Sequence, residues 1–211
     1  MRRDGATPPG ARLPARHDPT PEDEAAPDFP EVKARSDAVI KALDTTKLTY
    51  WAQRAQSEPD PARKVVWLRR LAQPLTEAAA GHVPCRDGCS HCCNIPVLLS
   101  HTEAAVIASE TGRPMARDVP YSLDRNDAYT GTPCPFLEGS RCGIYAVRPI
   151  ACRTHYSAEA DGSLCNVKDS IKTVRYVNTK GFDIAYVLAF GPDEVQRYAD
   201  IRDFFPERPA A

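Results

Sequence analysis

The sequence lacks the features of a membrane-bound or exported protein. No stretch approaches the roughly 18–20 apolar residues that a membrane-spanning helix needs. Arg2 and Arg3 stand near the start, but no hydrophobic segment follows them, so we expect neither a secretory nor a twin-arginine signal. These absences predict a cytoplasmic protein with no membrane partner.

An excess of charge of either sign is also missing. The 27 basic and 28 acidic residues leave a net charge of −1, so the chain has no broad basic field for binding a nucleic acid. The 11 glycines are scattered and form neither a dinucleotide-binding nor a phosphate-binding loop. No HExxH helix or Ser-His-Asp order is present either. We therefore assign no catalytic residue and leave open whether the protein is an enzyme.

Two residue types are abundant instead. Proline accounts for 20 of 211 residues, about twice the usual ~5%, and is concentrated in residues 1–30. Because residues 1–30 contain few bulky apolar side chains, we expect a disordered proline-rich tail there. Eight cysteines in a protein expected to remain in a reducing compartment indicate metal binding before they indicate disulfides.

Residues 31–82 are predicted to form a helical N-terminal segment. Apolar residues recur there at steps of three and four, with acids and bases on the remaining faces. Breaks are expected near residues 44–46 and at Pro59-Asp60-Pro61, where Asp60 is placed to cap a helix and Pro61 to begin it. Two or three helices therefore precede the first cysteine.

Residues 83–211 are predicted to form a cysteine-cluster metal-binding domain. One helix is expected after Ser100, because Glu103 follows at capping-box spacing and Gly112 provides a stop. Residues 113–165 are rich in proline, glycine and aspartate, and such a long irregular stretch needs something other than a hydrophobic core to hold it.

The C-terminal part of this domain contains apolar segments at 171–177 and 182–190 that fit either a helix or a strand. A final helix is expected from about Pro192, because apolar residues follow at helical spacing. Its apolar stripe consists of Val195, Tyr198, Ile201 and Phe205. The predicted fold class is therefore mainly α, with a loop-rich, metal-stabilised cysteine core and a small irregular α+β content.

The first cysteine group lies within the run CRDGCSHCC. The turn at Asp87-Gly88 brings Cys85 and Cys89 toward one point, and Cys92 comes within reach if the chain coils there. Three thiolates form most of a tetrahedral sulfur site and leave one ligand to come from elsewhere. Later cysteines are available to supply it, namely Cys134, Cys142, Cys152 and Cys165.

Two neighbouring cysteines complicate a simple site. The side chains of Cys92 and Cys93 should diverge, so both rarely bind one ion. If both are ligands, the site is polynuclear or there are two sites. Otherwise Cys93 is a small buried hydrophobic residue.

Two separated motifs resemble one family. The run CRDGCSHCC, with Val97-Leu98-Leu99 leading into a Ser-x-x-Glu-Ala helix, is similar to the zinc- or iron-chelating cysteine-cluster family, the YkgJ-type proteins. The later runs Pro133–Leu137 and Cys142–Arg153 are similar to the same family and occur in the family's order. Together the motifs cover about residues 84–156.

The resemblance implies a bacterial metal-binding domain that holds zinc or iron. An iron–sulfur cluster is one form that bound iron would take. Flagellin lysine methylases contain a related cysteine cluster, which suggests protein modification as one role. The chelating set implied by the resemblance is Cys85, Cys89, Cys92, Cys93, Cys134, Cys142 and Cys152.

Other residues near the motifs are weaker candidates. Cys165 and His155 are less favoured as metal ligands, because Cys165 lies outside the matched motifs and a histidine near cysteines is more often a hydrogen-bonding residue. Arg148 and Arg153 are predicted to offset the negative charge of thiolates from just outside the ligand set.

Three function classes remain open after the sequence analysis. The first is a metal-cluster protein with redox or protein-modifying activity, and the second is a structural zinc module that binds an unknown protein partner. The third is a metal buffer or delivery protein. We further predict that the two cysteine groups share one site. The first is one thiolate short of a tetrahedron if Cys93 points away, and the second is spaced too loosely for a complete zinc knuckle.

Overall fold

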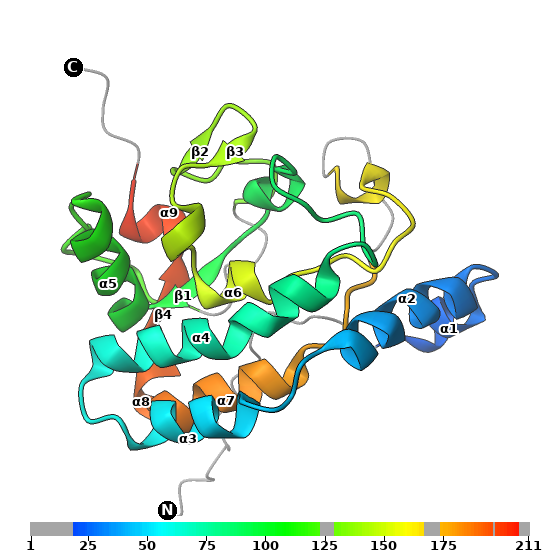
Figure 1. Ribbon diagram of the computed structural model, residues 1–211. Helices are drawn as coiled ribbons and strands as arrows, with labels where there is room; N and C mark the ends of the chain where they lie inside the picture. Colours follow the sequence, from blue (N-terminus) through cyan, green and yellow to red (C-terminus); the bar gives the residue numbers. More distant parts are fainter. Residues whose placement is uncertain (1–18, 123–128, 167–173, 196, 207–211) are drawn as a thin grey trace, which may run out of the picture.

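The computed structural model describes residues 19–122, 129–166, 174–195 and 197–206. It is mainly helical with a few short strands, which confirms the predicted fold class (Figure 1). The α-helices are α1 (Pro21–Ala25), α2 (Phe29–Ala42), α3 (Leu48–Ser57), α4 (Pro61–Ala79), α5 (His101–Thr111), α6 (Ile150–Arg153), α7 (Lys180–Phe190), α8 (Pro192–Val195) and α9 (Ile201–Phe204). The 3₁₀ helices are η1 (His91–Asn94), η2 (Tyr145–Val147) and η3 (Ser163–Cys165), and the strands are β1 (Leu98–Ser100), β2 (Leu137–Glu138), β3 (Arg141–Cys142) and β4 (Tyr198–Asp200).

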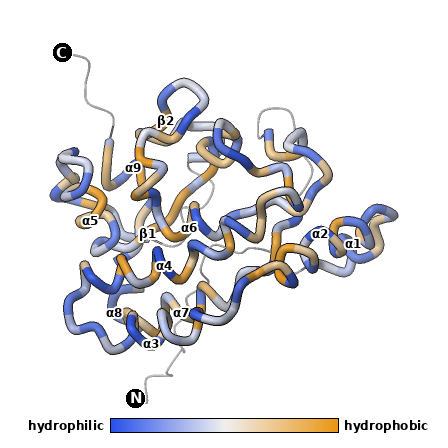
Figure 2. The backbone as a smooth tube through the Cα atoms, in the orientation of Figure 1, coloured by the Kyte–Doolittle hydropathy of each residue, from blue (hydrophilic) through white to orange (hydrophobic). Residues whose placement is uncertain are grey.

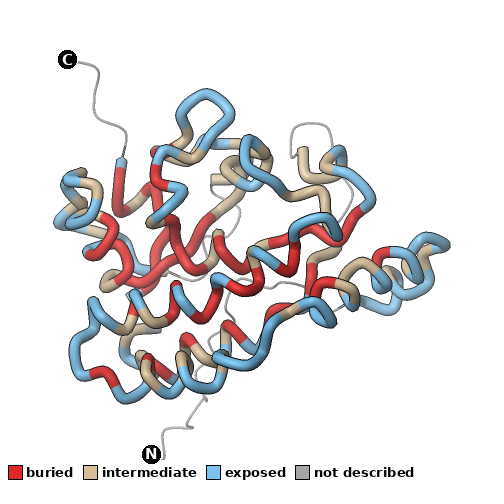
Figure 3. Tube along the Cα trace, in the orientation of Figure 1, coloured by how far each residue is buried: buried red, intermediate tan, exposed pale blue. Residues whose placement is uncertain are grey.

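The N-terminal helices begin earlier than the sequence predicts. The expected end of the tail at residue 30 falls inside α2, and α1 already begins at Pro21. Thr20 caps α1 through a reciprocal pair of hydrogen bonds with Asp23, so local capping stabilises a helix that buries none of its residues. The rest of the predicted tail, residues 1–18, lies outside the described residues. Figure 3 shows α1 and α2 as a largely exposed arm.

Helix α4 is the central element of the fold. Asp60 accepts a hydrogen bond from the backbone of Ala62 and Pro61 occupies the first turn, as the sequence predicts. Hydrophobic and hydrophilic residues alternate along α4 (Figure 2), and α4 contacts α2, α3, α5, α6 and α7. Among the described residues, no helix, α4 included, is long and apolar enough to cross a membrane.

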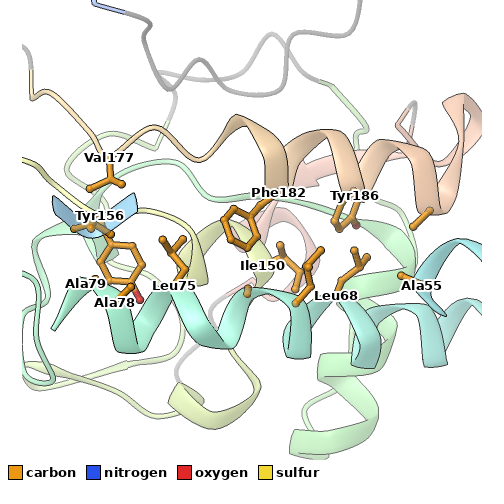
Figure 4. Close-up of a cluster of buried hydrophobic side chains, with 14 of the residues drawn as sticks. Ala55, Leu68, Leu75, Ala78, Ala79, Ile150, Tyr156, Val177, Phe182 and Tyr186 are labelled. Carbon is orange, nitrogen blue, oxygen red and sulfur yellow. The ribbon is translucent and has the colours of Figure 1, made fainter. Parts of the chain in front are cut away.

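The first hydrophobic core lies between α4 and α7 (Figure 4). Leu68 and Leu75 of α4 face Phe182 and Tyr186 of α7, and Leu75 is completely buried. Ile150 at the start of α6 belongs to the same cluster. This core therefore places α6, which carries Cys152, against α4.

The predicted helix after Ser100 is present as α5. The Ser100 hydroxyl accepts a hydrogen bond from the Glu103 backbone, and Gly112 ends the helix with a φ of 68°. The Glu103 carboxylate does not complete a capping box. It is buried and accepts a hydrogen bond from the Ile150 backbone N–H at 2.6 Å. Because Ile150 is the first residue of α6, Glu103 stabilises the start of that helix instead.

The predicted C-terminal helix from Pro192 is wrong as a continuous element. The chain forms only the short α8, then strand β4, then the short α9. Strand β4 pairs antiparallel with β1, and Asp200 caps α9 by accepting a hydrogen bond from the Arg202 backbone at 2.9 Å. A strand forms here because β1 supplies hydrogen-bonding partners from a distant part of the chain.

A second hydrophobic core is formed around strands β1 and β4. It contains Leu99 from β1, Ala199 from β4, Phe204 from α9 and the following Phe205. The ring centroids of Phe136 and Phe205 lie 4.9 Å apart, edge to face. This core holds the segment that precedes the β2–β3 hairpin against the C-terminal residues.

Candidate metal centre

The first cysteine group occupies a turn and a 3₁₀ helix that follow α4. Gly88 has a φ of 85°, which a residue with a side chain rarely adopts, and the Cys89 backbone donates to the Arg86 carbonyl at 3.0 Å. Cys92 and Cys93 both lie in η1. This short segment therefore places four cysteines within nine residues of chain.

The second cysteine group is spread over three short elements. Cys134 precedes β2, Cys142 lies in β3 opposite Leu137, and Cys152 lies in α6. The two groups meet directly through the backbone, because Cys134 N–H donates to the Cys93 carbonyl at 2.7 Å. Figure 1 shows η1 close to the β2–β3 hairpin.

Both groups line one cavity of about 480 Å³. Its walls also contain apolar side chains, among them Val97, Ile144, Tyr156 and Ile201. The cysteines that line it are Cys85, Cys89, Cys92, Cys93, Cys134, Cys142 and Cys152. Cys85 packs against the first core, whereas Cys134, Cys142 and Cys152 pack against the second, so the cavity lies between the two.

The thiols surround the cavity without converging on one point. Within the described ranges, no three cysteine, histidine, aspartate or glutamate residues are gathered closely enough to hold a metal ion. All eight cysteines are free; Cys92 is exposed and the others are half-buried. A metal ion bound here would have to draw thiols inward from the cavity walls.

Burial keeps several of these thiols protonated. It raises the pKa of Cys85 to about 12, and it is also the largest cause of the raised pKa of Cys134, Cys142 and Cys152. The pKa of Cys92 is raised first by the neighbouring Cys93 thiol and then by desolvation of its sulfur, although the residue as a whole is exposed. Since a metal binds the thiolate, loading must displace protons from these groups.

Arg148 is a buried positive charge in the cavity wall, which also contains the exposed Arg86. It is 7% exposed, stacks on the Tyr145 ring with its guanidinium carbon 3.7 Å from the ring centroid, and lowers the pKa of Cys142. Its Nε has no hydrogen-bond partner among the residues that the structure describes. The Arg148 guanidinium is therefore placed to offset negative charge on thiolates.

Arg153 is placed differently from Arg148. It does not line the cavity, and its Nε donates to the Arg148 carbonyl at 3.0 Å while Nη2 donates to the Ala146 carbonyl. Arg69 from α4 donates to the Val147 carbonyl at 2.9 Å. The two arginines thus hold the backbone that presents Arg148 to the cavity.

Glu103 links α5 to the helix that carries Cys152. Burial raises its pKa to about 7 from an ordinary value near 4.5, although the Ile150 N–H and the charges of Arg69 and Arg153 act in the opposite direction. Between these two pH values the unfolded chain releases this proton while the folded protein keeps it. This group therefore makes the folded protein less stable as the pH rises through that range.

A Glu103→Gln variant should remove this pH dependence, because glutamine cannot ionise and its amide oxygen still accepts the Ile150 N–H. Between pH 4.5 and 7, the free energy of unfolding of the unmodified protein should fall by up to about 3 kcal/mol more than that of the variant. Urea unfolding of both proteins across this range measures the difference. Parallel curves would show that Glu103 titrates normally in the folded protein.

Of the weaker candidate ligands, the structure places one in the cavity wall and one outside it. His155 lines the cavity and lies 4.3 Å from the Tyr176 ring, centroid to centroid. Cys165 in η3 is not among the residues that line it. The charge of a Cys165 thiolate nevertheless raises the pKa of Cys85, so η3 lies near this side of the centre.

The sequence analysis missed the contribution of the C-terminal segment. Ile201 lines the cavity, and Arg202 donates hydrogen bonds to carbonyls of both cysteine segments. In the sequence, this contribution appears only as Asp200-Ile201-Arg202, and such a short run does not indicate which distant residues it contacts. Only the pairing of β4 with β1 brings these residues to the site.

Comparison with known proteins identifies the same region of the chain. The CxxCxxCC family model, described as a putative zinc- or iron-chelating domain, matches residues 84–176. Searches of curated proteins and of solved structures found no match. The match contains all eight cysteines and confirms the family suggested by the cysteine motifs. The chain therefore contains, at residues 84–176, a region similar to the CxxCxxCC zinc- or iron-chelating domains.

Proposed function

We propose that the two cysteine groups form one polynuclear thiolate centre that remains open to a further ligand. The observation that carries this proposal is the single cavity of about 480 Å³ with seven cysteines in its walls. A closed structural zinc site needs only four ligands and no adjoining space. Seven thiols around one space supply more sulfur than one tetrahedral ion accepts.

The donor set fits zinc and iron. Thiolates are soft ligands that both metals accept in tetrahedral geometry, and iron–sulfur clusters are also held by cysteine thiolates. Cys92 and Cys93 are adjacent and both line the cavity, which supports more than one metal position. Cys165 lies outside the cavity lining and is not part of the proposed ligand set.

The surroundings suit a centre whose charge changes during function. Arg148 supplies a buried positive charge, and the apolar walls lower the local dielectric, so both affect the redox potential or Lewis acidity of a bound metal. We therefore favour redox or catalytic work, including protein modification, over metal storage. Cys92 is the exposed residue among the eight cysteines, so we expect a substrate to approach the centre from its side.

A structural zinc module remains the second candidate function. The observation that favours it is the position of the cavity between the two hydrophobic cores, with Cys85 on one and Cys134, Cys142 and Cys152 on the other. An ion bound there would tie the cores together. Such a module would act by presenting a rigid surface to a protein partner.

Anaerobic purification followed by metal analysis and visible absorption tests the proposal. A polynuclear centre predicts two or more metal ions per chain, and an iron–sulfur cluster would add brown colour and acid-labile sulfide. Colourless protein with a single zinc ion per chain would contradict the polynuclear centre and support the structural module. Purification from cells supplied with both metals prevents the growth medium from deciding the result.

A further inference from the structure

The two cysteine segments are joined at one backbone contact. Cys134 N–H donates to the Cys93 carbonyl and Gly131 N–H donates to the Asn94 carbonyl, both at 2.7 Å. These two bonds set how Cys93 and Cys134 lie relative to each other. Two backbone hydrogen bonds between irregular segments stabilise their relative position only weakly. A site that holds metal ligands from both cysteine segments needs further contacts between them.

One guanidinium bridges the same contact. Arg202 Nη2 donates to the Cys93 carbonyl at 3.1 Å and also to the Thr132 carbonyl, while Nε donates to the Pro133 carbonyl at 3.2 Å. The same Nη2 lies 3.3 Å from the Ile95 carbonyl. Arg202 therefore contacts the backbone on both sides of the junction, immediately beside Cys93 and Cys134.

Asp200 holds Arg202 in this position. Its Oδ1 accepts from Arg202 Nη1 at 2.9 Å, and its Oδ2 accepts from the Val97 backbone N–H at 2.7 Å. The side chain of Asp200 is fully buried and that of Arg202 is 6% exposed. A buried ion pair with this many hydrogen bonds is geometrically restrained, because any shift would leave a charge unpaired in an apolar environment.

We propose that Arg202 is a positioning residue for the metal centre, holding the backbones beside Cys93 and Cys134 together so that both thiols face one cavity. This inference rests on the proposed metal-binding role of the two cysteine groups. It extends the centre beyond residues 84–176, because Asp200 and Arg202 lie outside the matched domain. The charge of Arg202 also lowers the pKa of Cys134, against the larger effect of burial.

Arg202→Gln tests this role with Co²⁺ as a spectroscopic probe. Glutamine removes the charge and most of the donors, so Co²⁺ affinity should fall at least tenfold. At saturating Co²⁺ the thiolate-to-cobalt absorption should also be weaker per chain, because fewer thiols reach the metal. A purely structural role would lower the denaturation midpoint and leave the spectrum of the saturated, folded protein unchanged.

Arg202→Lys keeps the test valid if the glutamine variant does not fold. Lysine retains the positive charge beside Asp200, but a single ammonium group cannot reproduce the planar fork that reaches carbonyls on both segments. The lysine variant should fold, as checked by far-UV circular dichroism, and still show the weakened cobalt absorption. Full recovery of affinity and spectrum by lysine would overturn the proposal.

Arg113→Gln is the matched control. Arg113 donates to the Pro135 and Phe205 carbonyls and its guanidinium carbon lies 4.8 Å from the centroid of the Phe136 ring, yet it contacts no backbone of the first cysteine group. Its loss should change Co²⁺ affinity less than twofold. Equal effects of the two glutamine variants would overturn a specific role for Arg202.

The outcomes separate this inference from the proposed function. If the unmodified protein does not bind Co²⁺, the metal centre itself is refuted, and the role of Arg202 with it. Normal binding in the unmodified protein together with unchanged affinity and spectrum in Arg202→Gln would refute only the positioning role.

Discussion

A Cys142→Ser variant should lose most of its bound metal and loosen both cysteine segments together. Cys142 lies in β3 and lines the same cavity as Cys85, Cys89 and Cys92. If each group completes the other, removal of one thiolate leaves the shared centre open and weakens every remaining bond. Metal content per chain should fall by more than half, and residues 85–93 and 134–152 should become protease-sensitive at the same time.

Cys165→Ser is the control for this experiment. Cys165 is also free and half-buried, but it does not line the cavity. This variant should keep the metal content and the protease resistance of the unmodified protein. Full metal content in Cys142→Ser, with cleavage confined to residues 134–152, would show that the groups bind metal independently.

Metal removal should loosen the cysteine region and leave the helical layer folded. The first core contains α4 and α7 residues such as Leu68, Leu75 and Phe182, which are buried without any help from a metal. Residues 84–95 and 131–153 instead form turns, 3₁₀ segments, the β2–β3 hairpin and the short helix α6, and we expect metal ligation to help hold them. Stringent chelation should therefore preserve most of the helical circular dichroism.

Hydrogen exchange measures this difference by region. Amides of residues 84–95 and 131–153 should exchange at least tenfold faster after chelation, while those in the middle of α4 should change little. Addition of Zn²⁺ or Fe²⁺ under anaerobic conditions should restore protection. Equal protection with and without metal would contradict the predicted contribution of ligation to the fold.

Local chemistry allowed several elements to be predicted from the sequence. The breaks between α2, α3 and α4 follow from polar and proline-containing stretches, and the start of α4 at Pro61 follows from the cap at Asp60. Ser100 and Gly112 likewise mark the ends of α5. These signals act within a few residues, so no knowledge of distant partners is needed to read them.

The cysteine motifs were also sufficient to identify the family at residues 84–176. Cysteine spacing reflects ligand geometry directly, so it can be recognised in the sequence even where the segment has no regular secondary structure. The choice of ligands remains a prediction, since the structure places seven cysteines around one cavity without gathering three of them at a metal-binding distance.

Other features depended on contacts between distant segments. Helical spacing from Pro192 predicted one helix, but pairing with β1 converts Tyr198–Asp200 into strand β4. Capping-box spacing at Glu103 predicted a local bond, but burial directs its carboxylate to Ile150, 47 residues away.

The sequence by itself therefore determined the helical class, the helix boundaries near the caps and the similarity of residues 84–176 to a metal-chelating domain. The tertiary structure alone decided which residues form the walls of the shared cavity and that Arg202, paired with Asp200, contacts the junction of the two cysteine segments. The physical reason is the distance along the chain over which each interaction acts. Caps, turns and ligand spacing act through neighbouring residues, whereas strand pairing and buried charge depend on which distant groups the folded chain brings into contact.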